Sequence, residues 1–336
     1  MYIICCAIIL RNSERMGTLL FNHAYIRKED LFMDGRKFFT GRASVPVIAI
    51  IATLLWGSAY PAVKSGYEIF KILQKDIPTK LIFAGYRFAI AGLLVLFVSW
   101  AMNRKLKLSG AEEVSKVFIL GVFYTTIQYI FFYVGLANTT GVNGSIMNGT
   151  VAFFSVVFAH FFYKNDKLNV TTVMGCIIGF LGIIIINFSE NLAISFNLYG
   201  DGFIIISAIF LSAASIYGKE LSKSINSILL TGYQLLFGGT LLIILGFVTG
   251  GQPLQFTFNG AVLLTYMSLL SAAAFTLWTL LLKYNKVGRI TVYNFLIPIF
   301  GAVLSAIILG ENIFHWKNLI ALTLVSTGIF IVNRKS

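Results

Sequence analysis

The sequence carries little charge. Only 12% of its 336 residues are charged and 57% are hydrophobic, whereas a soluble domain carries about 25% charged residues. The mean hydropathy is +0.84. A water-soluble fold could not bury so much apolar surface, so the composition excludes that class. It predicts an all-α integral membrane protein, because the bilayer interior offers the backbone no water.

Cysteines and catalytic motifs are also scarce. Cys5 and Cys6 lie near the start and Cys176 in an apolar stretch, which fits neither a disulfide framework nor a metal site. His160 and His315 lack convergent acidic or cysteine partners, so we expect no metal ligation. The sequence contains no GxSxG, HExxH, Walker or Rossmann motif. We therefore expect no enzyme, no cofactor and no self-contained ATP-driven pump.

Positive charge exceeds negative charge, but it is dispersed. The net charge is +13, and the 26 basic residues stand singly or in small groups between apolar runs. This pattern indicates membrane topology and not a nucleic-acid-binding face. With the amino terminus inside, the cytoplasmic loops and tail would hold 13 basic residues and the outer loops five. We therefore expect both termini in the cytoplasm and the chain in the cytoplasmic membrane of a bacterium.

Ten apolar segments have about the length that crosses a hydrocarbon core as a helix, roughly twenty residues. The predicted transmembrane helices span residues 45–67, 77–100, 114–137, 144–163, 169–188, 199–219, 227–249, 260–283, 288–309 and 316–333. The connections are short, so consecutive helices should run antiparallel.

Residues 1–43 differ from the rest of the chain. The apolar start MYIICCAIIL is too short to span a bilayer and lacks the features of a signal peptide. The protein either begins at Met33, ahead of the basic stretch MDGRKFFTGRAS, or carries a disordered cytoplasmic extension. Under both readings we expect the residues before about Ser44 to be dispensable.

The chain repeats itself. A shift of 146 residues places YKNDKLNVTTVMGCIIGFLGIIIIN, from Tyr163, over LGENIFHWKNLIALTLVSTGIFIVN, from Leu309, and pairs Asn148 with Asn294. A weaker match at another offset pairs Lys64 with Lys219. These matches predict two five-helix repeats, residues 44–190 and 198–334. Because five is odd, the second repeat must be inverted, which is typical of transporters with a site near the midplane.

Three segments carry a family resemblance. LLWGSAYPAVKSG, YRFAIAGLLVL and YNFLIPIFGAVLSAIILGENIFHWKNLIALTLVSTGIFIVN resemble the EamA-type transporters of the drug/metabolite transporter superfamily. The first-half copy departs from the pattern, with Ala152 where a proline is common and Asn165-Asp166 in place of Gly-Glu. The resemblance implies ten helices in two inverted repeats around a central cavity. It further implies export or exchange of amino acids, aromatic compounds, metabolites or drugs.

Polar and aromatic residues near the predicted midplane are the candidates for a substrate site. An unpaired polar group in lipid is costly, so these side chains should face a cavity or another helix. Cavity lining and contacts between helices remain open as roles for each of them. The predicted substrate-binding residues are Trp56, Ser58, Tyr60, Arg87, Gln128, Asn148, Trp278, Tyr293 and Asn294.

The charged residues inside the spans have competing interpretations. Arg87, deep in the second span, either binds a substrate carboxylate or snorkels to the interface or to backbone carbonyls. Lys64 is either an interfacial anchor or a ligand. The carboxylates all lie near helix ends, which favours facilitated diffusion or exchange over proton coupling, with Glu68 as the candidate titrating acid otherwise.

Small residues and prolines suggest how the helices pack and bend. Pro61 and Pro298 can kink their helices. The sequence Gly175-x-x-x-Gly179 permits close approach of another helix, either inside the protein or in a homodimer.

The sequence therefore predicts a transporter of a small organic solute, with membrane lipids as its surroundings. The alternative is a non-transporting membrane protein, such as a lipid-modifying enzyme or a scaffold. An enzyme of that kind should show several acids, bases or metal ligands clustered at one membrane face, and the sequence shows no such cluster.

The loop charges predict that Ser109 faces the cytoplasm. We expect that Ser109→Cys will resist labelling by an impermeant thiol reagent in intact cells and will react once the membrane is opened. The unsubstituted protein is the control for background labelling. Efficient labelling in intact cells would reverse the predicted orientation.

Overall fold

The computed structural model describes residues 36–102, 106–164, 169–186, 196–311 and 316–333. All regular elements in these ranges are helices, so the all-α prediction is confirmed. The predicted start at Met33 and the residues Asn165, Asp166 and His315 lie outside the described ranges.

The first half of the chain forms helices that are interrupted in its third and fourth segments. They are α3 (Ser44–Ile69), α4 (Ile77–Ala101), α5 (Ala111–Gly121) continued by the π-helix η1 (Val122–Ile127) and α6 (Gln128–Ala137), α7 (Gly141–Met147), α8 (Thr150–Phe162) and α9 (Val170–Ile186).

The second half has a corresponding order of helices. They are the π-helix η2 (Leu198–Gly202) continued by α10 (Phe203–Ser224), α11 (Ser227–Val248), α12 (Phe258–Tyr284), α13 (Val287–Thr291) continued by the 3₁₀ helix η3 (Val292–Phe295) and α14 (Leu296–Leu309), and α15 (Trp316–Asn333).

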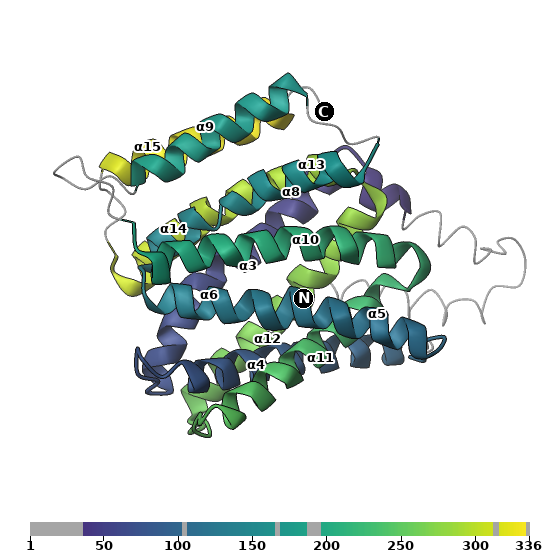
Figure 1. Ribbon diagram of the computed structural model, residues 1–336, viewed down its shortest axis with the longest axis vertical. Coiled ribbons are helices and arrows are strands. Elements are labelled where there is room, and N and C mark those ends of the chain that lie inside the picture. The colour runs from purple at the N-terminus through teal and green to yellow at the C-terminus, as the bar shows by residue number, and fades with distance from the viewer. Residues whose placement is uncertain (1–35, 103–105, 165–168, 187–195, 312–315, 334–336) are drawn as a thin grey trace, which may run out of the picture.

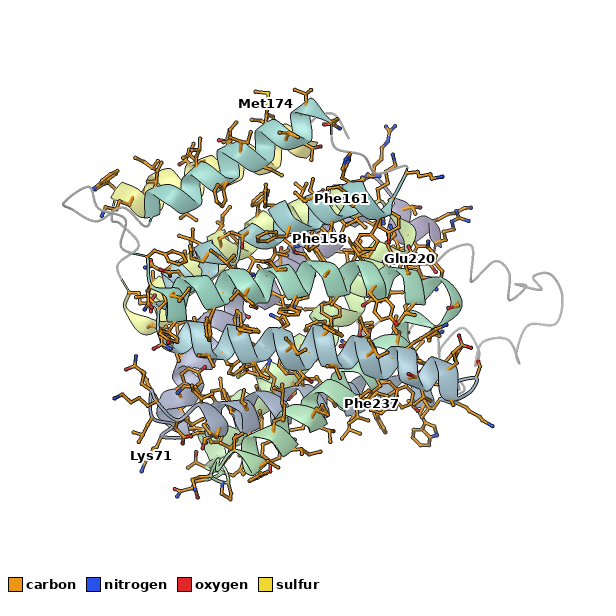
Figure 2. The ribbon with its side chains drawn as sticks, viewed as in Figure 1. Lys71, Phe158, Phe161, Met174, Glu220 and Phe237 are labelled. Carbon is orange, nitrogen blue, oxygen red and sulfur yellow. The ribbon has the colours of Figure 1, made fainter. Side chains whose placement is uncertain are left out.

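Within the described residues, eight helical segments are long and apolar enough to cross a membrane. Two shorter apolar helices, Val170–Gly182 and Leu319–Gly328, lie within α9 and α15. The chain is thus a multi-span membrane protein, whereas ten crossings in two inverted repeats stay a prediction. Large apolar side chains are exposed, such as Trp100 on α4. Phe161 on α8 and Met174 on α9 point outward in Figure 2, as expected where lipid surrounds the helices.

Glycines set the closest helix contacts. α4 packs against α11 along one edge of the bundle, and α9 packs against α15 along the opposite edge (Figure 1). A Cβ atom on Gly92 would lie 2.5 Å from the backbone nitrogen of Leu236, and one on Gly239 would lie 2.4 Å from that of Ala89. The two backbones therefore touch, as small residues allow in membrane helices.

The Gly175-x-x-x-Gly179 sequence packs inside the chain. A Cβ atom on Gly328 of α15 would lie 2.5 Å from the carbonyl oxygen of Gly175 and 3.1 Å from the nitrogen of Gly179. This contact joins α9 to α15. It resolves the two alternatives for the sequence in favour of an internal contact, and homodimer formation stays a prediction.

Contacts between loops define the two ends of the bundle. At the Lys64 end, Gln74 Nε2 donates to the carbonyl of Ala137 at 3.2 Å, and Asn197 Nδ2 donates to that of Asn138 at 3.0 Å. At the Lys219 end, the Tyr233 hydroxyl donates to the carbonyl of Leu106 at 2.9 Å. Since alternate loops meet at each end, consecutive helices run antiparallel.

Residues 36–43 reach the Lys219 end. Asn285 Nδ2 donates to the carbonyl of Phe39 at 2.7 Å, and the Phe39 ring stacks on Tyr284 with centroids 6.2 Å apart. The segment immediately before α3 is therefore in contact with the loop between α12 and α13. We therefore expect the residues before this segment to be dispensable and residues 36–43 to contribute to stability.

Two truncations separate these parts. Expression from Met33 keeps Phe39 and should leave membrane insertion and transport intact, whereas expression from Ser44 removes the contact with Asn285 and should lower the thermal unfolding midpoint by a few degrees. Phe39→Ala in the full chain is the matched control. It removes only the stacking of the Phe39 ring on Tyr284, so it should lower the unfolding midpoint less than the start at Ser44 does. Loss of stable protein from the Met33 start would contradict the expectation.

Candidate functional site

The predicted site residues lie mostly in the interior. Seven of the nine are buried, with exposed fractions between 1% for Arg87 and 8% for Trp56. Ser58 and Tyr293 are partly exposed. The structure therefore places most of the predicted residues between helices and not against lipid.

Aromatic side chains from both halves of the chain meet in the centre. The rings of Trp56 on α3 and Trp278 on α12 lie 5.0 Å apart, and Trp56 also contacts Phe275 at 5.4 Å. Tyr129 of α6 lies 6.4 Å from Phe275. We call this set the central aromatic cluster; its members are Trp56, Tyr60, Tyr129, Phe132, Phe275 and Trp278.

The cluster can provide flat apolar walls for a ligand. Its rings meet mostly edge to face, which is the favoured geometry for aromatic pairs. The indole nitrogen of Trp56 is buried and has no hydrogen-bond partner in the described residues. That N–H is a donor available to a polar group in the centre.

Arg87 of α4 borders the central aromatic cluster. Its Nε donates to Ser271 Oγ at 2.8 Å, and its Nη1 donates to the Tyr133 hydroxyl at 3.3 Å. The guanidinium lies over the rings of Phe88 and Tyr129, 4.8 and 5.9 Å from their centroids. The buried Nη2 has no hydrogen-bond partner in the part of the chain that is described.

Asn148 and Asn294 occupy two helix interruptions. α7 ends at Met147 and α8 begins at Thr150, so Asn148 lies between them, and Asn294 lies in the 3₁₀ turn between α13 and α14. In each case the amide Oδ1 is buried without a hydrogen-bond partner among the described residues. Interrupted backbone at membrane depth is tolerated where protein buries it or where it lines a cavity.

The two interrupted segments touch each other. The Ser145 hydroxyl, one turn before Asn148, donates to the carbonyl of Pro298, one turn after Asn294, at 3.3 Å. Further along, Ala152 contacts Phe295. The asparagines therefore lie close to the same crossing of two helices, and each offers an unused acceptor there.

Some predicted residues have other surroundings. Gln128 Nε2 donates to Ser207 Oγ at 2.7 Å and so joins α6 to α10. Ser58 accepts a hydrogen bond from the exposed Tyr266 at 2.7 Å, at the periphery of α3 and α12. The described contacts thus bring neither residue to the central aromatic cluster.

Sequence reasoning missed Ser271, Phe275 and Phe132 as neighbours of the site. The chain has 31 phenylalanines, and nothing in composition or spacing distinguishes Phe275 and Phe132 from the others. Ser271 does carry a weak signal, because it lies 146 residues after Thr125, which makes an equivalent contact described below.

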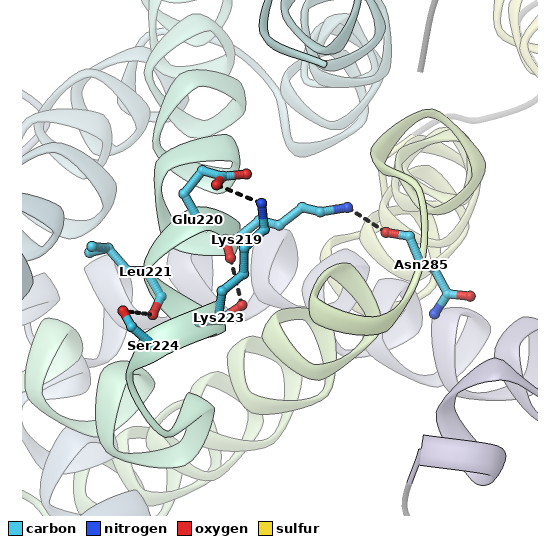
Figure 3. A network of polar contacts seen from close by, with 7 residues as sticks. Lys219, Glu220, Leu221, Lys223, Ser224 and Asn285 are labelled. Atoms are coloured by element: carbon cyan, nitrogen blue, oxygen red, sulfur yellow. Dashed lines mark hydrogen bonds and ion pairs between the residues drawn. The ribbon is translucent and has the colours of Figure 1, made fainter. Parts of the chain in front are cut away.

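At each end of the bundle, a lysine donates a hydrogen bond to the backbone carbonyl of a loop residue. Lys64 Nζ donates to the carbonyl of Thr139 at 2.5 Å, and Lys219 Nζ donates to that of Asn285 at 2.5 Å. Figure 3 shows the second contact, with Glu220 and Lys223 paired beside it at 2.7 Å. We call the Lys64–Thr139 and Lys219–Asn285 hydrogen bonds the two lysine latches.

Two carboxylates add contacts at the Lys64 end. Glu311 accepts a hydrogen bond from the backbone nitrogen of Gly141 at 3.0 Å, and Asp201 accepts one from the Thr139 hydroxyl at 3.4 Å. Both acids belong to the second half of the chain, whereas the loop they hold belongs to the first. No group of three potential metal ligands occurs in the described residues.

Comparison with known proteins gives one family. The model of the EamA-like transporter family matches residues 44–188 and 198–334. The uncharacterized transporter YoaV of Bacillus subtilis is 27% identical, over 84% of this chain and 94% of its own length. The uncharacterized transporter YvbV of the same species is 28% identical, over 84% and 89%, respectively. An uncharacterized transporter of Archaeoglobus fulgidus is 25% identical, over 79% and 89%.

The fold is also found in a solved structure. A crystal structure with 16% sequence identity aligns with a TM-score of 0.69, over 87% of this chain and 96% of the other. At that identity the match establishes a shared fold.

The interruption at Asn294 generates a prediction. Asn294→Leu keeps the approximate size but removes the amide, so solute exchange should fall about tenfold, on the order of one lost hydrogen bond in a buried site. Expression should change little. Leu324→Ala on α15 is the matched control and should leave exchange unchanged. Normal exchange by folded Asn294→Leu would place the site elsewhere.

Proposed function

The chain belongs to the EamA-like transporter family, and we propose that it carries a small organic solute across the cytoplasmic membrane by exposing one central site alternately to each side. Membership in this family, within the drug/metabolite transporter superfamily, makes the chain a membrane transporter. Its surroundings are lipid and its substrate is a small molecule.

Equivalent contacts occurring twice support two inverted repeats. The carbonyls bound by the two lysine latches belong to Thr139 and Asn285, which are 146 residues apart. Lys64 lies near the end of α3 and Lys219 near the end of α10, yet the two residues lie at opposite ends of the bundle. α3 and α10 therefore run in opposite directions, as inverted repeats require.

A second pair of contacts follows the same relation. Arg87 on α4 binds Ser271, and Gln234 on α11 accepts a hydrogen bond from Thr125 at 2.8 Å. Ser271 and Thr125 are again 146 residues apart. Together with the interruptions at Asn148 and Asn294, this gives three features that recur across the two halves.

The lysine latches are suited to control access from the two sides. Each one ties a long helix, α3 or α10, to the loop that precedes an interrupted segment. Releasing one latch loosens the loop at that end, which then keeps only its other hydrogen bonds, while the latch at the other end stays formed. In the present conformation both latches are formed and most of the candidate site is buried, which corresponds to an enclosed state.

Carboxylate positions favour exchange or facilitated diffusion. Asp201 and Glu311 lie at the Lys64 end, and Glu220 lies at the Lys219 end. In the described residues, no carboxylate contacts the central aromatic cluster.

Basic residues are more numerous at the Lys219 end, which we assign to the cytoplasm, with both termini.

The observation that carries the proposal is the pair of lysine latches at opposite ends. Purified protein in liposomes should exchange a labelled probe against unlabelled probe on the other side, tested with an aromatic amino acid, an aromatic amine and an aromatic carboxylate. A carrier shows this counterflow, whereas a channel, a scaffold or a lipid-modifying enzyme does not.

The latches predict opposite effects of two substitutions. Lys64→Met should favour the state open at the Lys64 end and Lys219→Met the state open at the other end. Each should lower the half-saturating probe concentration on its own side and raise it on the opposite side, by about tenfold, since a hydrogen bond from a charged donor contributes roughly 1.5–3 kcal/mol. Lys116→Met, at an exposed helix start, is the control. Changes on the same side for both variants would contradict the proposal.

A further inference from the structure

Arg87 is a buried cation without a counter-charge. Its two protein partners, Ser271 and Tyr133, are neutral, and its Nη2 is unpaired. The ion pairs found among the described residues, Lys116–Glu112 and Lys223–Glu220, do not involve it. A guanidinium stays protonated under all physiological conditions, so the charge is permanent.

Arg87 differs from the other buried basic side chains. Lys80 is fully buried, but its Nζ donates to the carbonyls of Leu73 and Gln74 at 2.5 and 2.6 Å, at the Lys64 end. Lys64 and Lys219 also reach loop carbonyls. Arg87 instead lies in the middle part of α4 and contacts side chains of α12 and α6. Its described contacts therefore show neither snorkelling to the membrane interface nor binding to backbone carbonyls, the two alternatives to substrate binding.

Packing alone does not require a cation at this position. The related contact in the other half is made by Gln234, a neutral amide that accepts from Thr125 and is equally buried. An amide thus satisfies the same type of helix contact. The charge at Arg87 brings the cost of placing an ion at membrane depth, and a hydrogen bond of this type between two helices does not need it.

The surroundings of Arg87 define what would complement it. The unpaired Nη2 carries two N–H donors, and either of them can donate a charge-assisted hydrogen bond to an oxygen of a carboxylate. Phe88 and Tyr129 cover the guanidinium and hold it in place. Beyond Tyr129 lie Phe275 and Trp56 of the central aromatic cluster, which suit a flat apolar body.

We propose that the transported solute is an aromatic monocarboxylate whose carboxylate binds Arg87 and whose ring enters the central aromatic cluster. This assignment rests on the proposed carrier function and specifies its substrate class. One cation surrounded by rings selects a single negative charge, and it disfavours an aromatic amine because like charges repel. Arg87 is then the specificity-determining residue.

Three probes of similar shape test this assignment: 3-phenylpropanoate, its neutral amide 3-phenylpropanamide, and 3-phenylpropylamine. At pH 7 the carboxylate should raise the thermal unfolding midpoint of the purified protein, because a ligand of the native state stabilises it. Its apparent affinity should exceed that of the amide by at least about tenfold, as expected for a charge-assisted hydrogen bond. The amine should not bind. Equal affinities for carboxylate and amide in the unsubstituted protein would overturn the proposal.

Arg87→Gln places at this contact the residue type that the chain uses at position 234. The carboxylate-to-amide affinity ratio should fall to about one, while the unfolding midpoint without ligand should not decrease. A purely structural arginine would give the reverse, a lower midpoint with an unchanged ratio. Gln234→Ala is the matched control, and it should leave the ratio as in the unsubstituted protein. Should Arg87→Gln fail to fold, the three-probe comparison in the unsubstituted protein still decides the question.

Counterflow separates this inference from the carrier function. Exchange of the amide as rapid as that of the carboxylate would support a carrier and refute the role of Arg87. Selective binding of the carboxylate without any exchange would support Arg87 and refute the carrier.

Discussion

Every polar group inside this bundle must find its partner within the protein, and most of the structure follows from that requirement. The bilayer interior has no water to bind backbone N–H and C=O groups, so the chain is helical wherever it is described at membrane depth. At the helix ends the same need is met by side chains. Asp76 binds the nitrogen of Thr79 at the start of α4, and Asn226 binds that of Ile228 at the start of α11.

The absence of water in the bilayer also determines how the helices pack. Lipid cannot drive apolar helices together as water does, so close packing has to come from small residues. Gly92 and Gly239 between α4 and α11, and Gly328 against Gly175, give that contact at opposite edges of the bundle. Between these two seams lie the interruptions at Asn148 and Asn294, and glycines bring helices close there too, because a Cβ atom on Gly301 would lie 2.5 Å from that of Ser145. Close glycine contacts thus occur at both edges of the bundle and beside its interrupted helices.

The sequence was sufficient for the class of fold and for much of the candidate site. Hydropathy predicts the spans because length and apolarity are local properties, and the observed helix bounds follow the predicted ones closely. Trp56, Trp278 and Arg87 are buried, whereas their part in a substrate site stays a prediction. The direction of a side chain around its helix could not. Ser58 and Trp56 lie two residues apart, yet Ser58 contacts exposed Tyr266 whereas Trp56 contacts Trp278. Both partners lie on α12, so the difference depends on which faces of α3 and α12 meet, and in a uniformly apolar chain no amphipathic period reveals this.

Several buried polar groups of the described chain lack a hydrogen-bond partner, which lowers stability. A protein under selection for stability alone would replace an unpaired cation and unused amide oxygens with apolar side chains, since buried polar groups without partners are destabilising. Arg87 Nη2, Asn148 Oδ1 and Asn294 Oδ1 are all buried and unpaired in the described chain. Local violations of otherwise consistent packing are expected where function requires them. Arg87 offers a positively charged donor beside the central aromatic cluster, which is the complement of the proposed aromatic monocarboxylate. Under the proposed mechanism, a solute that binds these groups more tightly in one conformation shifts the protein toward that conformation.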